Sequence, residues 1–128
     1  MNTSESRTQK SSTSSIGLAE YDLWTIKERT DTKLMSWDES RLYNVFCLAS
    51  EAGEVADAVK RQLRGDYGRS KCPYDYGEDI LLELGDVLYY VCRIADDHGF
   101  TLEEVAAANV EKLTNRKKYG KGKAGKRS

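Results

Sequence analysis

The run from Ile80 to Cys92 carries only two charged residues among thirteen, Glu83 and Asp86. At 100° per residue its hydrophobic side chains cover most of the circumference of a helix, so the pattern predicts a buried helix. The two acids lie one turn apart, and Tyr90 follows Asp86 by four residues. Buried carboxylates this close repel each other and lose hydration, so we expect a divalent cation between them. The apolar arc consists of Ile80, Leu84, Val87, Leu88, Val91 and Ala95, widened by Leu81 and Cys92.

Helical spacing of apolar residues predicts two helices before this one. The first begins at Leu18 and fades into polar residues near position 32. Ser36 followed by Glu39 has the form of a capping box, and it precedes a helical run over about 40–64 that Gly65 closes. The stripe of this second helix that we expect to face the core consists of Leu42, Val45, Ala49, Ala52, Ala56, Val59 and Leu63.

The second helix carries another acidic pair, Glu51 and Glu54, on the side away from that stripe. Two glutamates at this spacing usually form a solvated surface. Here the helical neighbours are Cys47 and Ala58 rather than further charges, and Gly53 costs about 1 kcal/mol of helix propensity. We therefore expect this second face to be partly covered.

The residues on either side of the run from Ile80 to Cys92 predict a loop before the buried helix and the two ends of that helix. Residues 65–77 are rich in turn formers and contain the only proline, so we expect a loop whose tyrosines could stack on a flat ligand. The buried helix should then span about 78–98 and end at Gly99. His98 lies beside that end, where a capping role is expected rather than a catalytic one.

A capping box from Thr101 to Glu104 opens a fourth helix over about 102–116. Its apolar stripe consists of Leu102, Ala106, Val110 and Leu113. Asn109, Lys112 and Arg116 share an adjacent face and offer an amide and two cations to one ligand. Such a face by itself is usually solvated, so phosphate binding here is a hypothesis.

No sustained alternation of period two occurs, so we predict an all-α fold of four main helices. We expect residues 1–15 to form a disordered Ser/Thr-rich arm, 16–116 to form the folded domain and 117–128 to form a flexible basic tail. If the two acidic helices face each other, four carboxylates converge, which suits Mg²⁺ or Mn²⁺. The proposed metal ligands are Glu51, Glu54, Glu83 and Asp86.

Composition narrows the function classes further. The 128 residues fit one domain with a net charge of −1, but residues 112–128 hold eight basic residues and no acid. Three widely spaced cysteines and a single histidine argue against a zinc site and against His-based catalysis. No apolar run approaches twenty residues, so we expect a soluble, cytoplasmic protein with reduced thiols.

The chain resembles the MazG-like, all-α nucleoside triphosphate pyrophosphohydrolases over roughly residues 21–119. The resemblance rests on LASEAGEVADAVKR from Leu48, LLELGDVLYYV from Leu81 and TLEEVAAANVEKL from Thr101. The family pattern of EExxE followed by ExxD is matched by Glu51, Glu54, Glu83 and Asp86. Ser50 stands where the pattern has its first Glu, which leaves open the number of metal ions and the base that activates water.

The resemblance implies a four-helix MazG-like bundle, assembled as a homodimer or a dimer of dimers. It also implies Mg²⁺-dependent hydrolysis of a nucleoside triphosphate, preferably a deoxyribonucleotide, to the monophosphate and diphosphate, with Mn²⁺ as a substitute. The four acids would hold the metal and carry the catalysis, and Asn109, Lys112 and Arg116 would bind the phosphates. Such an enzyme belongs to the control of nucleotide pools.

Two alternatives stay open. One is a narrower all-α phosphohydrolase, such as a dUTP or dCTP pyrophosphatase or a phosphoribosyl-ATP pyrophosphatase, because stacking candidates such as Trp24 and Trp37 do not select a base. The other is a helical module that binds nucleic acid through the basic tail. The acidic folded part and the lone tail aromatic, Tyr119, argue against this second alternative.

Overall fold

The computed structural model describes residues 15–29, 35–65 and 73–120, and the side chains of the third helix from residue 79 onward. These ranges contain four helices and no strand, which confirms the predicted all-α class. Residues 1–14 of the predicted N-terminal arm and 121–128 of the predicted basic tail lie outside the described residues. The helices are α1 (Leu18–Lys27), α2 (Trp37–Arg64), α3 (Pro73–Asp97) and α4 (Leu102–Tyr119).

The predicted capping boxes are confirmed at the starts of α2 and α4. The hydroxyl of Ser36 accepts from the Glu39 backbone N–H, and the Glu39 carboxylate accepts from the Ser36 N–H. Thr101 and Glu104 repeat this arrangement at the start of α4. Gly65 ends α2 with a φ of 73°, a conformation that glycine adopts without strain.

Three helices are longer than predicted, and α2 begins at Trp37 rather than near residue 40. α3 begins at Pro73, so residues 73–77, which we predicted as part of a loop, are helical. Proline suits a first helical position because its φ is preset and no intrahelical partner is needed for its nitrogen. α4 continues to Tyr119, beyond the predicted end at Arg116, and Gly120 follows it.

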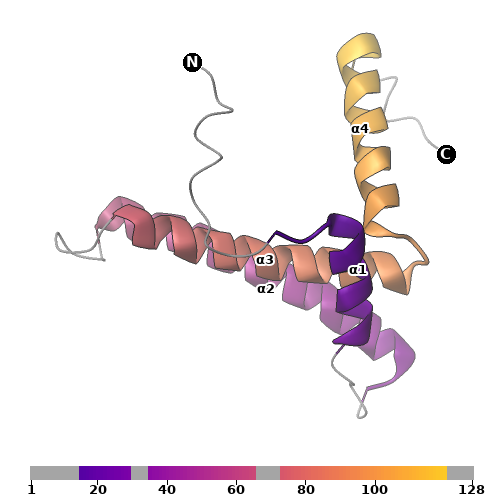
Figure 1. Ribbon diagram of the computed structural model, residues 1–128, viewed down its shortest axis with the longest axis horizontal. Helices are drawn as coiled ribbons and strands as arrows, with labels where there is room; N and C mark the ends of the chain where they lie inside the picture. The colour runs from indigo at the N-terminus through magenta and orange to yellow at the C-terminus, as the bar shows by residue number, and fades with distance from the viewer. Residues whose placement is uncertain (1–14, 30–34, 66–72, 121–128) are drawn as a thin grey trace.

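The helices α2 and α3 run antiparallel, side by side, and make the most extensive contact in the chain (Figure 1). The start of α2 is tied to the end of α3, because Arg41 Nη2 donates to the Asp97 carbonyl at 2.6 Å and Asn44 Nδ2 donates to its carboxylate at 2.9 Å. α1 packs on α3 near this end of the pair and also contacts α4. α4 rises from the same end and points away from the pair (Figure 1), so within one chain the four helices do not lie alongside one another as a bundle.

The face of α2 that packs on α3 is not the one we predicted. Ala58 is buried and Glu51, Val55 and Leu48 are half-buried, all on the side that carries the acid. Periodicity identifies which residues share a face, but it does not identify the face that a partner covers. The stripe predicted as core is exposed in the single chain, namely Leu42, Val45, Ala49, Ala52, Ala56, Val59 and Leu63.

A polar contact fastens α1 to both α3 and α4. Asp22 is buried on α1, and its carboxylate accepts from the Leu102 backbone N–H at 2.8 Å, at the first turn of α4. Thr25 is fully buried and donates to the Asp22 carbonyl at 2.7 Å. The Cys92 thiol of α3 lies against this pair, and burial raises the pKa of Cys92 to about 11. Asp22 was not predicted as a contact residue, because it is one of two acids within the apolar pattern of α1 and the sequence does not distinguish it from the exposed Glu20.

The connection from α3 to α4 is short and hydrogen-bonded. Gly99 has a φ of 78°, the Gly99 N–H donates to the Asp96 carbonyl at 3.0 Å, and the Phe100 N–H donates to the Ala95 carbonyl at 2.8 Å. These are the two bonds of a Schellman motif. His98 Nδ1 bonds the Ile94 carbonyl at 2.8 Å, which confirms its predicted role at the helix end.

We predict that Asp22→Ala lowers the free energy of unfolding by about 1–3 kcal/mol, because the buried Leu102 N–H then lacks a partner. Urea denaturation at a fixed protein concentration measures this loss. Glu20→Ala, an exposed acid on the same helix, serves as the matched control and should change the free energy by less than about 0.5 kcal/mol. Equal effects of the two substitutions would contradict the assigned contact.

Candidate metal and phosphate site

Three of the four predicted metal ligands come together where α2 packs on α3. Glu51 projects from α2, and Glu83 and Asp86 project from successive turns of α3. One carboxylate oxygen from each of the three lies within 4.8 Å of the other two. Glu51 and Glu83 are half-buried, whereas Asp86 is exposed. We call this partly exposed group of Glu51, Glu83 and Asp86 the acidic notch.

The charges in this notch repel one another. Burial raises the pKa of Glu51 above its usual value, and the neighbouring Asp86, Glu83 and Glu54 raise it further. Among the described residues, every charged neighbour that shifts this pKa is another acid. The packing of α2 on α3 thus stabilises this arrangement in spite of its electrostatics.

The donor set suits a hard divalent cation. All three groups are carboxylates, and oxygen ligands are those that Mg²⁺ and Mn²⁺ prefer. A cation placed among the three oxygens would relieve the repulsion that raises the Glu51 pKa. Glu54 is exposed one turn after Glu51 and lies outside the group of three, although its charge still acts on Glu51. The residues present therefore fit the metal that the sequence suggested.

Two tyrosines near the notch face different partners. Burial raises the pKa of Tyr21 on α1, and electrostatic interactions with Cys92 and Asp86 raise it further, so among the acids of the notch Tyr21 interacts with Asp86. Tyr21 also stacks on Trp24, with ring centroids 5.7 Å apart. Tyr90, by contrast, forms a side-chain hydrogen bond with Cys47 of α2. The sequence analysis linked Tyr90 with the acids and overlooked Tyr21.

The three predicted phosphate ligands lie on α4, apart from the acids. α4 contacts α1 and α3 but, over the described residues, makes no contact with α2. Asn109 and Lys112 are exposed, and Arg116 is half-buried. The structure therefore does not bring them to Glu51 within one chain.

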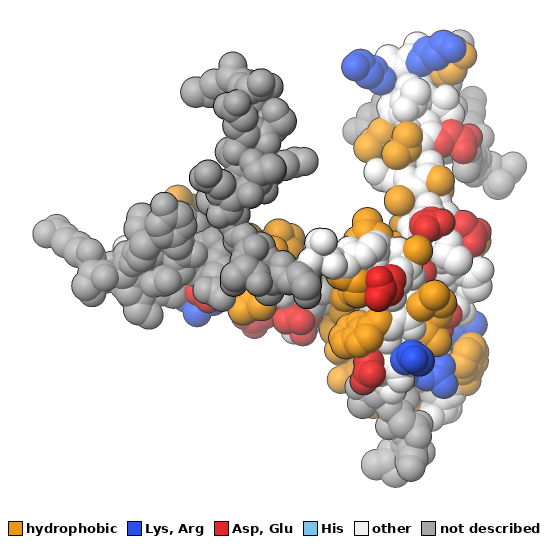
Figure 2. Space-filling view, in the orientation of Figure 1, with side chains coloured by type: hydrophobic (Ala, Val, Ile, Leu, Met, Phe, Trp, Pro, Cys, Tyr) orange, Lys and Arg blue, Asp and Glu red, His pale blue; other side chains and the backbone are white. Residues whose placement is uncertain are grey.

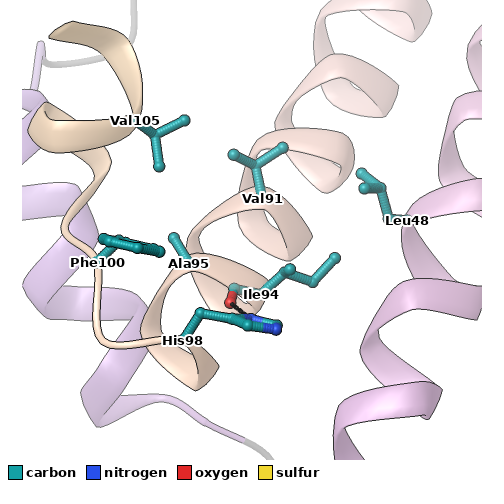
Figure 3. Close-up of a pocket in the computed structure, with 7 residues that line it drawn as sticks. All are labelled: Leu48, Val91, Ile94, Ala95, His98, Phe100 and Val105. Atoms are coloured by element: carbon teal, nitrogen blue, oxygen red, sulfur yellow. Dashed lines mark hydrogen bonds between the residues drawn. The ribbon is translucent and has the colours of Figure 1, made fainter. Parts of the chain in front are cut away.

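An apolar pocket of about 390 Å³ occupies the angle between α4 and the helix pair (Figure 3). Leu48 of α2 and Val105 of α4 face each other across it. The lining holds no acid, so this pocket is separate from the acidic notch. Its residues are Leu48, Val91, Ile94, Ala95, His98, Phe100 and Val105.

Comparisons with known proteins show the family to which this chain is similar. The model of the MazG nucleotide pyrophosphohydrolase domain matches residues 39–120, a stretch that includes all four acids and the polar face of α4. The chain is 37% identical over 82 residues to the Gene 37 protein of Mycobacterium phage L5, covering 64% of this chain and 70% of that protein. It is 32% identical over 106 residues to the uncharacterized protein YvdC of Bacillus subtilis, covering 77% and 94%. No solved structure matches the chain significantly.

None of the helices in the described part of the chain is both long enough and apolar enough to cross a membrane.

We predict that Glu51→Gln raises the thermal midpoint of the metal-free protein by a few degrees at pH 7. The pKa of Glu51 is raised in the fold, so its ionised form is less favourable in the folded chain than in the unfolded chain. Stability is then lost as the pH rises above the ordinary Glu value of 4.5 and through the raised pKa. Replacing the Glu51 carboxylate by an uncharged amide should restore the stability that ionisation removes.

The pH dependence provides the control for this prediction. At roughly pH 3.5 the acid is mostly protonated in both states, so the midpoints of the variant and the wild type should converge. Thermal unfolding in EDTA at both pH values measures the effect. Glu20→Gln should not raise the midpoint at either pH, since Glu20 is exposed on α1. A lowered midpoint for Glu51→Gln at pH 7 would contradict the repulsion.

Proposed function

The chain belongs to the MazG nucleotide pyrophosphohydrolase family, and from this membership we propose that it hydrolyses nucleoside triphosphates to the monophosphate and diphosphate in a reaction that requires a divalent cation. The observation that carries the proposal is the convergence of three carboxylate oxygens within 4.8 Å, supplied by two helices of the matched segment. We further propose a preference for deoxyribonucleoside triphosphates. The enzyme would then act in the control of nucleotide pools.

In this proposal Glu51, Glu83 and Asp86 hold the cation, and Glu54, exposed one turn after Glu51, supplies a fourth carboxylate to it. When bound, Mg²⁺ supplies positive charge to the phosphates and activates water for attack. A carboxylate of this group would accept the proton of the attacking water, because water at the α phosphorus must lose one as the anhydride bond breaks.

A triphosphate carries more negative charge than the cation bound by these acids offsets. Cationic and amide donors aimed at the phosphate oxygens stabilise the charge that develops as diphosphate leaves. Asn109, Lys112 and Arg116 offer such donors on one face of α4. We therefore assign phosphate binding to this face. A substrate bound there must also contact the acidic notch on α2 and α3.

We also propose that the protein is a homodimer or a dimer of dimers. Among the described residues the buried apolar side chains are few, namely Ala58, Cys92, Ala95 and Leu102. The stripe along α2 from Leu42 to Leu63 is exposed over its whole length, and alanines occupy its middle. Burying a large aliphatic side chain contributes about 1.5–3 kcal/mol, so a second copy packed on this stripe would supply the core that one chain lacks.

The first prediction from this proposal concerns the products. Incubation with a panel of ribo- and deoxyribonucleoside triphosphates and Mg²⁺ should release the monophosphate and diphosphate, resolved by anion-exchange chromatography. EDTA should abolish turnover, and excess Mg²⁺ or Mn²⁺ should restore it. Glu54→Gln and Asp86→Asn keep side-chain size but remove one negative charge each, and turnover should fall at least about 100-fold.

Glu103→Gln provides the matched control, since this exposed acid on α4 lies outside both acidic pairs and should leave turnover unchanged. Circular dichroism should show that all three variants keep their helices. Release of orthophosphate, or turnover that persists in EDTA, would contradict the proposal.

A second prediction concerns the exposed stripe of α2. Val45→Glu should convert the oligomer into monomers at micromolar concentration, because a charge would be buried in the interface. Val45 is 46% exposed in the single chain, so the substitution should not disturb the fold of one copy. Gln62→Glu adds the same charge to α2 outside the stripe and should leave the assembly intact. Light scattering after size-exclusion chromatography distinguishes the two results, and a wild-type monomer would contradict the assembly.

A further inference from the structure

One turn of helix separates the acidic notch from another contact between α2 and α3. On α2, Cys47 precedes Glu51 by four residues. On α3, Tyr90 follows Asp86 by four residues. Since the two helices run antiparallel (Figure 1), a step back along one matches a step forward along the other. The side chains of Cys47 and Tyr90 therefore meet about 6 Å along the helices from the carboxylates.

A hydrogen bond from the Tyr90 hydroxyl to the Cys47 sulfur joins the two helices at this point. Burial raises the pKa of Tyr90 above its ordinary value of 10.0, and the bond raises it further because it stabilises the protonated phenol. The Tyr43 hydroxyl bonds the same sulfur from within α2. Cys47 is a free, half-buried thiol, and it connects a tyrosine of its own helix with one of the facing helix.

Cys47 lies between an attractive and a repulsive contact of the helix pair. Asn44, Cys47 and Glu51 follow one another on α2 at steps of three and four residues, so they share a face. All three are half-buried. Near the end of the pair, Asn44 Nδ2 donates to the Asp97 carboxylate at 2.9 Å. On the other side of Cys47, Glu51 faces the acids of α3.

The carboxylates of the acidic notch push α2 and α3 apart in the metal-free chain. The basic residues in the last turn of α4 lie elsewhere, because Lys and Arg side chains gather at the outer end of that helix, away from the pair (Figure 2). Contacts that span the two helices close to the notch therefore have to hold its oxygens within 4.8 Å of one another. The bond between Cys47 and Tyr90 is such a contact.

We propose that Cys47 is a positioning residue for the acidic notch: by accepting from Tyr90 across the helix pair, it holds Glu51 near Asp86 before the cation binds and so raises the affinity for the cation. This inference rests on the proposed function, in which the notch binds a divalent cation. Without the bond, repulsion widens the notch, and part of the binding free energy of the cation is then needed to close it.

A positioning role differs in its consequences from a purely structural one. Sulfur is a weak acceptor, so the bond contributes little to the stability of the fold. Its deletion also lets the carboxylates separate, which offsets part of that loss in the metal-free chain. The proposal therefore predicts weaker cation binding with nearly unchanged stability of the metal-free protein. A purely structural bond would lower the stability and leave the affinity unchanged.

Titration of the full-length protein with Mn²⁺ alone, without nucleotide, tests the proposal. The electron paramagnetic resonance signal of free Mn²⁺ gives the Kd, and thermal unfolding in EDTA gives the stability of the metal-free protein. Cys47→Ala and Tyr90→Phe should each raise the Kd about fivefold, since each deletes the same bond. The double variant should also show about a fivefold increase rather than the product of the two. The midpoints in EDTA should stay within about 2 °C of wild type.

Two conservative substitutions provide the matched controls. Cys47→Ser keeps an acceptor at this position and should restore the Kd to within about twofold of wild type. Tyr43→Phe deletes the hydroxyl that bonds the same sulfur from within α2. Because that bond does not join the helices, its loss should change the Kd by less than about twofold.

Three results overturn the positioning role. The first is a Kd of Cys47→Ala equal to that of wild type. The second is weaker binding by Tyr90→Phe without weaker binding by Cys47→Ala, because Tyr90 would then act on the cation without Cys47. The third is a lowered midpoint in EDTA with an unchanged Kd, because the bond would then only stabilise the fold.

These measurements separate the positioning role from the proposed function. A protein that shows the expected Mn²⁺ affinities but releases no diphosphate refutes the proposed function and keeps the positioning role. Diphosphate release with equal Mn²⁺ affinities in wild type and Cys47→Ala keeps the function and overturns the positioning role. A wild-type protein that binds no Mn²⁺ overturns both the metal site and the role of Cys47.

Discussion

The structure depends on one electrostatic constraint, the convergence of three carboxylates where α2 packs on α3. Their oxygens lie within 4.8 Å, and burial together with the neighbouring acids raises the pKa of Glu51. Helix packing has to offset this repulsion in the metal-free chain, and a bound cation would convert the same charges into attraction. The repulsion that opposes folding thus comes from the same oxygen donors that suit a divalent cation.

The second property of the chain is that its helices leave apolar faces open. α2 uses its acidic side to contact α3, which exposes the stripe from Leu42 to Leu63, and α4 exposes Val110 and Leu113. Exposed apolar faces of this kind are typical of surfaces that a partner covers.

α1 contributes more through polar contacts than through its apolar residues. Leu18, Leu23, Trp24 and Ile26 are exposed, whereas Asp22 and Thr25 are buried against α3 and α4. A carboxylate that caps the first turn of another helix is directional, unlike a hydrophobic contact, so it can determine the angle at which α4 leaves. This angle decides where Lys112 and Arg116 lie.

Local patterns in the sequence determined the helices and the chemistry. The caps at Ser36 and Thr101, the end at Gly65 and the pairing of Glu83 with Asp86 all depend on residues within four positions of each other, which a helix brings together by itself. Tertiary structure decided which side of α2 faces α3, that Asp22 caps α4, and that Asn109, Lys112 and Arg116 lie away from Glu51. These contacts join residues as far as 80 positions apart. An amphipathic pattern specifies which residues share a face, but only packing chooses the partner that covers it.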